Sequence, residues 1–524
     1  MIFRQIFAKL SSAMNSVVDF LEISAKKYPN KIFLKTDSKE ITYFDFLNKV
    51  KRISLCFSLY KNKPIVVYVT NPIRTLELFF AVLYSGNYYV PIDIANPDER
   101  KKQILSSVYL NMDKRIVVGF DNEYFVEEYN ESFDNVKRKT LQIKDVLTKE
   151  DEQNIDAKVQ NINLLDPCYI VYTSGSTGVP KGVIKSHLAI KSFAETFSQT
   201  FDIKPSDVFG NQTPLYFDAS AKDIYLALKN SATIAFIAKE KFSFPVKLVE
   251  YLNDNKVSII SWVPSALSIV AQFNTFKVAK PKTLKKVMFV GEVMPIKYLN
   301  YWFENVKARY FNLYGSSETA GIICYYEIKN KLPETSKLPI GKNLRNAEIM
   351  IINDDGELAK PNEIGEIYVR GPMLASGYFN SKELTEKVFV QNPLNSSFLD
   401  TVYKSGDMGY RDDDGNIVFA ARRDFQIKHM GHRIELTDIE IATSTISVIK
   451  ECCAVYNQNA KRIVLYYSLN QQLDSASAYI KKELLEKLPD YMIPNKYVCV
   501  EDLPKLPNGK IDRKKLNMEI NTNG

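Results

Sequence analysis

The chain has 524 residues, 45% of them hydrophobic and 25% charged, a composition that excludes a disordered protein. Its 69 basic and 61 acidic residues leave a formal charge of +8, which is mild for this length and typical of a solvated, lysine-rich surface. No apolar run reaches the roughly 18 residues of a membrane span. No basic stripe with interleaved aromatic residues appears either, so a nucleic-acid role has no support.

A chain of this length is expected to fold as a large multi-lobed domain plus a small one. Six cysteines and three histidines lack the spacing of a zinc or redox site, so we expect a reduced, cytoplasmic protein without a His-rich metal centre. Residues 1–16 mix positive and apolar side chains, but their apolar run is too short for a signal peptide. We treat them as an N-terminal extension.

The first half of the chain alternates short apolar runs with helical patterns. Leu76, Phe79, Phe80 and Leu83, for example, recur at helical spacing between two apolar runs. Apolar strands separated by helices are typical of buried parallel strands in an α/β architecture. Residues 121–165 are charged and weakly patterned, which predicts a surface excursion. The predicted strands are 64–70, 88–93, 115–120, 169–175, 233–238, 257–263 and 286–292.

The sequence pattern changes after residue 345, where short strands alternate with Asp-Gly turns. Beyond residue 425 a smaller unit is predicted, with helices 437–449 and 475–488 and strands near 452–456 and 462–468. We therefore place a domain boundary at Asp424. The predicted division is an extension (1–16), a large domain (17–423), a small domain (424–516) and a tail (517–524).

The segment YIVYTSGSTGVPKG (169–182) is the strongest chemical signal in the sequence. A hydrophobic strand leads into a loop of glycines and hydroxyls that ends in a lysine. Glycines let backbone N–H groups approach an anion, hydroxyls donate further bonds and the lysine adds charge, so the loop predicts a phosphate site. Its spacing is not that of a Walker loop. A flexible Ser/Gly linker is disfavoured, since a linker would not follow a buried strand.

Three later segments complete a nucleotide site. Residues 312–319 (NLYGSSET) join a tyrosine that could stack on a purine to a carboxylate, Glu318, that could hold Mg²⁺. Residues 403–407 (YKSGD) place an acid beside a glycine turn, where it could bind ribose hydroxyls. Residues 506–513 (LPNGKIDR) present a lysine on a tight turn. Each segment is weak alone, but together they describe an ATP site.

These segments resemble the ordered core motifs of the adenylate-forming enzymes, which include acyl-CoA synthetases, luciferase and adenylation domains of nonribosomal peptide synthetases. The resemblance covers residues 17–516, and GPMLASGYFNSKELTEKVF (371–389) and RRDFQIKHMGHRIEL (422–436) fit it as well. It implies an α/β fold in which a large N-terminal domain of mixed sheets and flanking helices carries a small, mobile α+β C-terminal domain. It also implies ATP and Mg²⁺ as cofactors.

The resemblance assigns roles by matching position. Lys510, Thr177 and Glu318 would be catalytic, with Glu318 placing Mg²⁺. The small domain would rotate about Asp424 after adenylation, so that Lys510 leaves and the face near Lys428 and Gly431 meets a pantetheine thiol. The residues implied to bind ATP are Thr173, Ser174, Gly175, Ser176, Thr177, Gly178, Lys181, Gly291, Glu292, Asn312, Tyr314, Gly315, Ser317, Asp407, Arg422 and Lys510.

FDAS (217–220) resembles the amino-acid-activating branch, in which the aspartate matching Asp218 binds the substrate ammonium. A carboxylate facing a narrow pocket needs a cationic partner, although Asp218 could instead cap the helix that follows it. Lys222 either points into the pocket toward an acidic substrate group or extends to solvent, and we favour the second. The implied pocket residues are Asp218, Ala219, Lys222, Ser261, Met288, Val290, Leu313, Gly321 and Ile322.

The expected activity is ATP-dependent activation of a small amino acid and its transfer to a thiol. FVGEVMP (289–295) and FDASAKDIY (217–225) are most similar to D-alanyl carrier-protein ligases. Only fourteen residues follow Lys510, so we expect the thiol on a separate phosphopantetheinylated carrier protein or on coenzyme A. An acyl-CoA or aryl-CoA synthetase and a catalytically degenerate scaffold are the alternatives. Departures from the family pattern occur at Ala421, Met430, Ser316 and Ser317.

Overall fold

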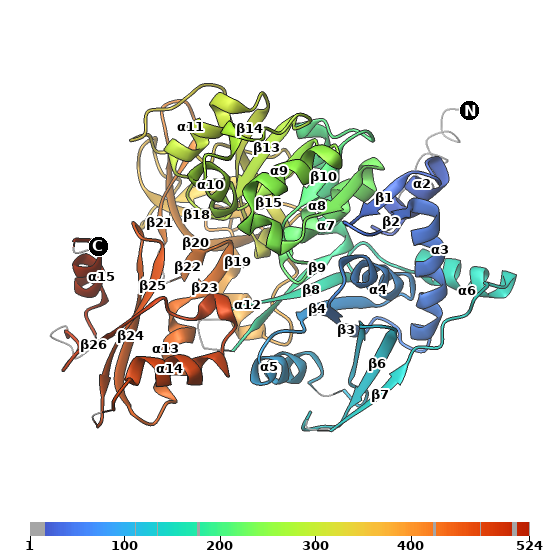
Figure 1. The fold of residues 1–524 in the computed structure, drawn as a ribbon, viewed down its shortest axis with the longest axis horizontal. Helices are drawn as coiled ribbons and strands as arrows, with labels where there is room; N and C mark the ends of the chain where they lie inside the picture. The colour runs from blue at the N-terminus through green and yellow to red at the C-terminus, as the bar shows by residue number, and fades with distance from the viewer. Residues whose placement is uncertain are drawn as a thin grey trace.

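The computed structural model (Figure 1) describes residues 16–110, 112–133, 135–174, 179–422, 426–471, 473–505 and 511–522. Residues 1–15 of the predicted extension, the predicted hinge Asp424 and the predicted catalytic Lys510 lie outside these ranges. The described chain forms three larger sheets flanked by helices, and a smaller unit carries the C-terminal elements on one side of the molecule.

A seven-stranded sheet forms the first lobe, in the order β7-β6-β5-β3-β4-β8-β9. Its inner strands β5, β3, β4 and β8 are parallel, as the buried apolar runs predicted. The strands are β3 (Pro64–Val69), β4 (Tyr88–Asp93), β5 (Ile116–Phe120), β6 (Tyr124–Tyr129), β7 (Val136–Thr140), β8 (Pro167–Thr173) and β9 (Lys181–Ser186). The helices interspersed with them are α4 (Pro72–Tyr84), α5 (Asp98–Val108) and α6 (Lys149–Gln160).

Residues 121–165 lie mostly at the surface, as predicted, but they are not unstructured, because this stretch adds β6 and β7 to the sheet edge and then forms α6. All five side chains of β7 are exposed, so it shows no hydrophobic alternation. Ion pairs from Arg138 to Asp121 and from Lys139 to Glu128 link it to neighbouring segments instead. An edge strand stabilised by such pairs has no hydrophobic signature in the sequence.

A nine-stranded sheet forms the second lobe, in the order β16-β15-β14-β13-β12-β10-β11-β1-β2. It is parallel from β14 to β1 and antiparallel at both edges. Its strands are β1 (Ile32–Lys35), β2 (Glu40–Thr42), β10 (Val208–Asn211), β11 (Thr233–Phe236), β12 (Ile259–Trp262), β13 (Lys286–Val290), β14 (Arg309–Ser316), β15 (Gly321–Ile328) and β16 (Lys342–Asn343).

Helices cover the nine-stranded sheet and join it to the first lobe. The buried faces of α3, α4, α7 and α8 share one hydrophobic core with the inner strands of both sheets. The helices of this part are α2 (Asp19–Lys27), α3 (Tyr43–Ser54), α7 (His187–Phe201), α8 (Asp218–Asn230), α9 (Pro245–Asp254), α10 (Pro264–Gln272) and α11 (Ile296–Asn305). The 3-10 turns are η1 (Leu55–Phe57), η2 (Lys239–Ser243), η3 (Thr275–Lys277) and η4 (Ser317–Thr319).

A five-stranded antiparallel sheet follows, with the strands β17-β18-β20-β19 in order and β21 paired to β20. It corresponds to the short strands and Asp-Gly turns predicted after residue 345. Its elements are β17 (Glu348–Ile352), β18 (Gly365–Arg370), α12 (Lys382–Val388), β19 (Phe389–Gln391), β20 (Thr401–Arg411) and β21 (Ile417–Arg422).

The C-terminal unit has its own hydrophobic core, formed by residues between Ile434 and Ile493. The hairpin of β22 and β23 precedes a three-stranded sheet of β24, β25 and β26, and the predicted helices and strands are all present. The elements are β22 (Gln426–His429), β23 (His432–Glu435), α13 (Leu436–Ser444), β24 (Ile449–Asn457), β25 (Arg462–Leu469), α14 (Ala476–Leu485), η5 (Asp490–Met492), β26 (Lys496–Cys499) and α15 (Arg513–Thr522).

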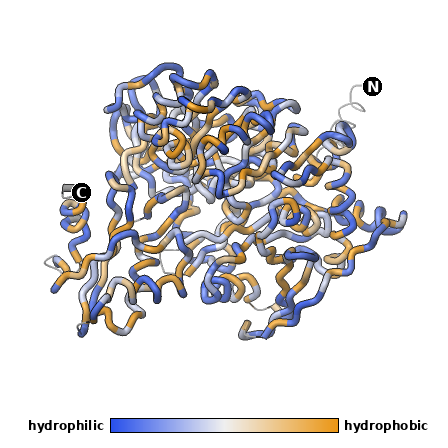
Figure 2. Tube along the Cα trace, viewed as in Figure 1, coloured by the Kyte–Doolittle hydropathy of each residue, from blue (hydrophilic) through white to orange (hydrophobic). Residues whose placement is uncertain are grey.

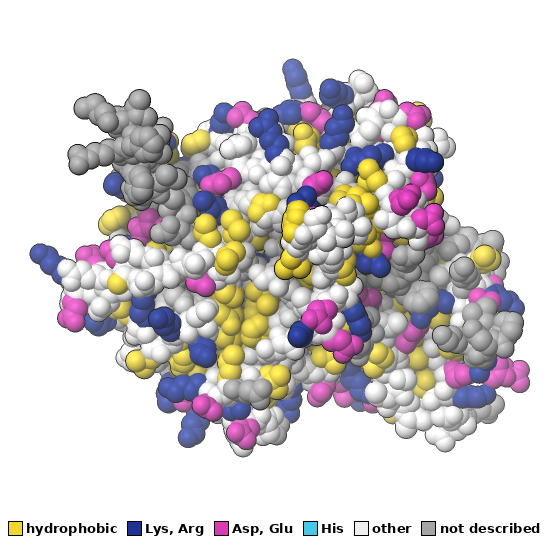
Figure 3. All heavy atoms as spheres, turned by 180° about the vertical axis from the view of Figure 1, so that it is seen from behind, with side chains coloured by type: hydrophobic (Ala, Val, Ile, Leu, Met, Phe, Trp, Pro, Cys, Tyr) yellow, Lys and Arg dark blue, Asp and Glu magenta, His cyan; other side chains and the backbone are white. Residues whose placement is uncertain are grey.

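Hydrophobic segments run through the interior of each lobe, and hydrophilic segments lie mostly at its outside (Figure 2). On the face shown in Figure 3, basic and acidic side chains are interspersed rather than segregated, as a mild net charge predicts. Within the part of the chain that the structure describes, no helix has both the length and the hydropathy that crossing a bilayer requires.

Candidate active site

The predicted pocket residues meet at one edge of the nine-stranded sheet. The carboxyl ends of parallel strands share an edge, where α/β proteins bind ligands. Strand register places Ser261 beside Met288 and Val290 beside Leu313, so four side chains come from three adjacent strands. The antiparallel return through η4 then brings Gly321 opposite Ser316 and Ile322 opposite Gly315. The pocket residues predicted on β12–β15 are therefore neighbours in space.

Gly315 shows why the turn between β14 and β15 needs glycine. A Cβ atom at Gly315 would lie 1.7 Å from the carbonyl oxygen of Gly321. Gly321 itself has a φ of +106°, which side chains rarely adopt. The two glycines let the strands approach closely and hold Glu318 between them.

Asp218 lies at the first turn of α8, and its carboxylate points to side chains rather than to the helix backbone. The hydroxyl of Tyr169 donates to Oδ1 at 2.8 Å, and the ammonium of Lys185 donates to Oδ2 at 3.1 Å. The residue at the N-cap is Phe217, and no side chain caps the helix. The helix-cap alternative for Asp218 is therefore wrong. Sequence reasoning missed both Tyr169 and Lys185 as its partners.

Lys222 is buried, which overturns the expectation that its ammonium extends to solvent. Its side chain is 4% exposed, and its Nζ donates to the carboxylate of Asp223 and, at 3.5 Å, to the carbonyl of Ser261. Asp223 also accepts a hydrogen bond from the side-chain amide of Asn211 at 3.0 Å. The inward direction follows from the position of Lys222 on the core-facing side of α8, where its charge needs a buried partner.

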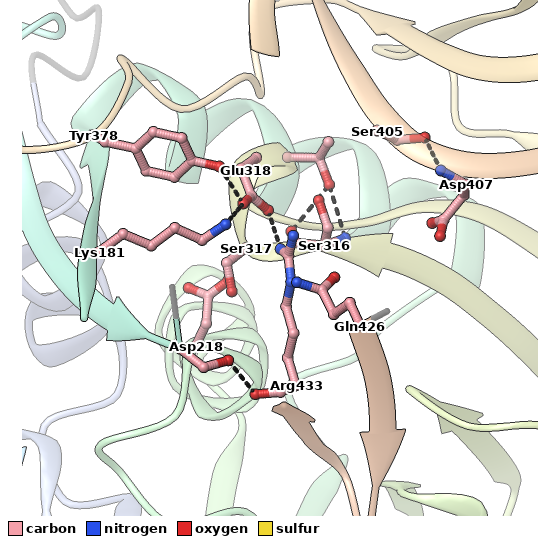
Figure 4. A network of polar contacts seen from close by, with 12 residues as sticks. Lys181, Asp218, Ser316, Ser317, Glu318, Tyr378, Ser405, Asp407, Gln426 and Arg433 are labelled. Carbon is pink, nitrogen blue, oxygen red and sulfur yellow. Dashed lines mark hydrogen bonds and ion pairs between the residues drawn. The ribbon is translucent and has the colours of Figure 1, made fainter. Parts of the chain in front are cut away.

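Glu318, the predicted Mg²⁺ carboxylate, is fully buried and already surrounded by donors. Figure 4 shows Lys181, Tyr378 and Arg433 converging on it. The Tyr378 hydroxyl donates to Oε1 at 2.7 Å, Arg433 donates to Oε2 at 2.6 Å, and the Lys181 ammonium lies 3.8 Å from Oε1. Burial alone would raise the pKa of Glu318, but Arg433 and Lys181 outweigh it and hold the pKa well below its usual range.

The start of the phosphate loop lies beside this carboxylate. Thr173 ends β8, and its hydroxyl is buried without a hydrogen-bond partner among the described residues. The hydroxyl of Ser174 donates to the backbone carbonyl of Arg433 at 2.8 Å. Lys181 begins β9, and burial together with Arg433 lowers the pKa of its ammonium. The loop residues Gly175, Ser176, Thr177 and Gly178 lie outside the described residues.

The predicted adenine and ribose residues also cluster. The Tyr314 hydroxyl donates to Asp407, and Arg422 donates to the other oxygen of Asp407 at 2.7 Å. Burial, reinforced by Asp407, raises the pKa of Tyr314 well above its usual range. Asn312, one pleat earlier on β14, donates to the carbonyl of Pro339 at 2.7 Å. Strands β14, β20 and β21 thus bring together groups that are far apart in the sequence.

The hairpin β22–β23 of the C-terminal unit reaches into this site. The backbone N–H of Gly431 donates to Glu292 at 3.0 Å, and the other oxygen of Glu292 accepts from the backbone of Ser265 at the same distance. Lys428 lies with its ammonium 5.7 Å from the centre of the Tyr314 ring, a cation–π distance. Burial lowers the pKa of Lys428, with Asp407 acting in the opposite direction. Lys428 and Gly431, which are predicted to face the incoming thiol, therefore both lie at the site.

Two family models match this chain along most of its length. The model of the AMP-binding enzyme matches residues 21–379, and the model of the AMP-binding enzyme C-terminal domain matches residues 438–510. The chain belongs to the AMP-binding enzyme family. The resemblance in the motifs is thereby confirmed.

Relatives within the AMP-binding family cover nearly the same length. The D-alanine–D-alanyl carrier protein ligase of Bacillus licheniformis is 29% identical over 96% of this chain and 99% of its own. The corresponding ligase of Bacillus anthracis is 31% identical over 87% of this chain and 89% of its own. Among solved structures, the adenylation domain AlmE of Vibrio cholerae, in complex with glycyl-adenosine-5′-phosphate, aligns with a TM-score of 0.79 at 18% identity, covering 97% and 98% of the two chains.

The likeness to AlmE confirms the predicted fold class, since the same arrangement of a large α/β domain and a small C-terminal domain recurs there. The described residues contain no group of three or more His, Cys, Asp or Glu that could hold a metal ion by themselves.

Proposed function

We propose that this protein activates a small amino acid with ATP and transfers it to the thiol of a separate carrier protein. The full-length similarity to D-alanyl carrier protein ligases supports the reaction, and the clusters around Glu318, Asp407 and Asp218 provide sites for phosphate, ribose and substrate. The observation that carries the proposal is the convergence of these three clusters around the end of β14. Tyr314 on β14 donates to Asp407, η4 with Glu318 follows β14, and Lys185 joins Asp218 to the carbonyl of Ser317 in η4. We also propose a cytoplasmic location, because the spacing of the six cysteines is not that of a zinc or redox site.

The first half-reaction joins the substrate carboxylate to the α-phosphorus of ATP. A new O–P bond forms and the bond to the pyrophosphate oxygen breaks, so the products are the aminoacyl-AMP and pyrophosphate. This chain's part is to position the reactants and neutralise charge. Lys181 and the loop 173–178 would hold the leaving phosphates, and Lys510 would contact the carboxylate and the α-phosphate. Asp407 and Arg422 would hold the ribose.

Glu318 fits the role of a Mg²⁺ ligand in its chemistry but not in the arrangement seen here. A carboxylate is the donor that Mg²⁺ prefers, and one or two carboxylates plus phosphate oxygens suffice. In this structure both oxygens of Glu318 are engaged by Tyr378 and Arg433, with Lys181 close by. Glu318 would hold Mg²⁺ only after Arg433 has withdrawn. When bound, the ion would neutralise charge on the phosphates.

The second half-reaction transfers the acyl group to sulfur. The carrier thiolate attacks the carbonyl carbon of the adenylate, a C–S bond forms, and AMP departs with the electrons of the C–O bond. The hairpin β22–β23 occupies the nucleotide side of the site in this structure. The N–H of Gly431 donates to Glu292, and the side chain of Arg433 donates to Glu318. We assign this arrangement to the second half-reaction, and we assign the small domain's rotation to the segment around Asp424.

Amino-acid-dependent exchange of pyrophosphate into ATP tests the first half-reaction. We expect exchange with a small amino acid from a panel of D- and L-amino acids, β-amino acids, and aliphatic and aryl acids. Lys510→Ala is the matched control and should reduce exchange by about a hundredfold or more, since a positioned charge at a transition state contributes on that scale. A folded protein that exchanges with no acid in the panel would sink the proposal.

Thioester formation on a purified phosphopantetheinylated carrier protein tests the second half-reaction. Mass increase of the carrier by one aminoacyl group should require ATP and the same amino acid. Coenzyme A is the competing acceptor. A thioester on coenzyme A alone, with the carrier left unmodified, would favour the acyl-CoA synthetase alternative.

A further inference from the structure

Asp218, the acid expected to bind the substrate ammonium, already has a cation from the chain itself. Lys185 lies on β9, its side chain is 0% exposed, and its ammonium is 3.1 Å from Asp218 Oδ2. The same ammonium donates to the backbone carbonyl of Ser317. On its other oxygen Asp218 accepts from Tyr169. A buried lysine costs several kcal/mol unless it is paired and hydrogen-bonded, and Lys185 has both kinds of partner.

Three buried acids at the site are paired with cations in the same way. Asp223 is paired with Lys222, Glu318 with Arg433 and Lys181, and Asp407 with Arg422. None of these four acids, Asp218 included, is left without a lysine or arginine neighbour. An entering ammonium would therefore find no uncompensated carboxylate among them.

The pairing changes what Asp218 can contribute to substrate selection. If Asp218 faced the pocket alone, an acid without an ammonium would leave its carboxylate buried and unpaired, which disfavours such ligands strongly. With Lys185 in place, a ligand without an ammonium leaves no charge unpaired. A ligand that brings an ammonium must instead share Asp218 with Lys185, and two like charges then lie beside one carboxylate.

We propose that Lys185 is a specificity-determining residue that supplies, from within the chain, the positive charge Asp218 would otherwise take from the substrate. The enzyme then accepts small carboxylic acids without an α-ammonium alongside the amino acids of the same size. This inference rests on the proposed adenylation function and widens its substrate class from amino acids to small carboxylic acids. Lys185 acts on the ligand through Asp218, so it is a positioning residue rather than a catalytic one.

The closed space beside Asp218 is smaller than any of these acids. A cavity of about 10 Å³ lies against Asp218, lined largely by aromatic and aliphatic side chains, and it holds one water molecule at most, so lining side chains must move before an acid can bind. The ring of Tyr169 stacks between those of Tyr89 and Tyr225, which fixes the hydroxyl that donates to Asp218. Tyr169 and Lys185 thus engage the two oxygens of Asp218 from within the chain.

Pyrophosphate exchange with paired acids measures the effect. Glycine is compared with acetate, and D- and L-alanine with propionate and lactate, in wild type and in Lys185→Met. We expect the kcat/KM values of each amino acid and its ammonium-free counterpart to agree within about tenfold in wild type. In Lys185→Met the ratio should rise about a hundredfold in favour of the amino acid, the scale of losing one partner of a buried charge pair.

Lys286→Met is the matched control, because Lys286 is also buried beside an acid, Asp207, at 3.9 Å and has no contact with the site. It should leave the ratio unchanged. A wild type that already prefers the amino acid a hundredfold, with the ratio unmoved in Lys185→Met, would overturn the inference while leaving adenylation intact. Absence of exchange with every acid would count against the proposed function itself.

Thermal unfolding tests the pair without any activity. Asp218→Asn leaves the Lys185 charge buried and alone, so its Tm should fall below that of Lys185→Met, and the double variant Lys185→Met/Asp218→Asn should recover most of the loss. Non-additivity of this kind marks a direct interaction. Purely additive shifts in Tm would mean that Lys185 and Asp218 do not interact, and the inference would fall.

Discussion

At the scale of single residues, the structure concentrates charge at Glu318 more than anywhere else in the site. Arg433 and Lys181 hold the pKa of this carboxyl well below its ordinary value of 4.5. Because the pKa is depressed in the folded state, the stability that Glu318 contributes is fully present above the unfolded value. It is lost as the pH falls through the folded value.

This predicts a difference on the acid side between wild type and Glu318→Gln. The Tm of wild type should drop more steeply below about pH 4.5 than that of Glu318→Gln, because only wild type takes up a proton there on unfolding. Above about pH 5 the two Tm curves should run parallel. Differential scanning calorimetry between pH 3 and pH 7 checks this. If the Tm of both proteins fell equally as the pH dropped, the pKa of Glu318 would not be depressed in the folded state.

Arg433 predicts a separation of the two half-reactions. Its ion pair with Glu318 joins the C-terminal unit to the large domain. Arg433→Met should slow thioester formation about tenfold, the scale of one charge-assisted hydrogen bond. It should leave pyrophosphate exchange within about twofold, since the proposed Mg²⁺ role of Glu318 does not use Arg433.

The control for Arg433 is Arg309→Met, which removes an exposed ion pair with Glu327 and should change neither rate. Stopped-flow or quench measurements of carrier loading, set beside exchange rates, separate the steps. Equal losses in both half-reactions would contradict the assignment of this ion pair to the second one.

Much of the nucleotide site could be predicted from residue types, because loops with glycine, hydroxyl and lysine side chains, and an isolated acid beside a glycine, have few other uses. The buried position of Lys185 could not be predicted. A lysine in a short strand is expected to be exposed, whereas Lys185 points inward, and its partner Asp218 comes 33 residues later. Only the contact between β9 and the first turn of α8 reveals the pair. The prediction that the Lys222 side chain extends to solvent is wrong because a lysine followed by an aspartate does not indicate, in the sequence, that the two side chains form a buried pair.

At the scale of elements, the turn of the hairpin β22–β23 is the point most sensitive to substitution. Gly431 has a φ of +82°, and a Cβ atom there would lie 2.5 Å from Cγ1 of Val263 in the large domain. Gly431→Ala should therefore weaken docking of the hairpin and slow thioester formation about tenfold or more. Adding Val263→Ala should restore part of the rate, because it removes the steric conflict but not the backbone strain.

Gly415→Ala provides the matched control for this turn. Gly415 has a similar φ of +75°, but nothing lies within 4 Å of its Cβ position. Both alanine variants should lose about 1 kcal/mol of stability from backbone strain. Only Gly431→Ala should lose thioester formation. A similar loss in both would mean that strain, rather than contact with Val263, sets the effect.

Strands with buried apolar runs were located within two or three residues from the sequence, since β3, β4, β5 and β13 lie where they were predicted. The edge strand β7 was missed because all five of its side chains are exposed and it is placed by main-chain pairing with β6. Helix α6 was missed in the same stretch, where only Asp151 and Ile155 are buried. Elements without a buried face leave no hydrophobic periodicity to find.

At the scale of the whole molecule, the C-terminal unit has a core of its own, which predicts that it loses stability independently. Ile480 is fully buried in that core. Ile480→Ala should cost about 2–5 kcal/mol within this unit. Hydrogen exchange should then rise in residues 434–493 while the large domain keeps its protection. The control is Leu299→Ala, buried in a core of the large domain, which should show the reverse pattern.

If Ile480→Ala instead raised exchange equally in both parts, the two cores would unfold as one cooperative unit. The proposed domain division near Asp424 would then need revision. The family models, which match residues 21–379 and 438–510 separately, agree with two units. The boundary residue itself stays a prediction.

The hairpin β22–β23 contacts the large domain partly through main-chain atoms. The N–H of Gly431 donates to Glu292, and the carbonyl of Arg433 accepts from the hydroxyl of Ser174. Bonds to the backbone do not depend on which side chain the neighbouring residue carries. Met430, directly before Gly431, is 60% exposed and takes part in neither of these two bonds. A substitution at Met430 can therefore change the outer rim of the site while both main-chain bonds stay in place.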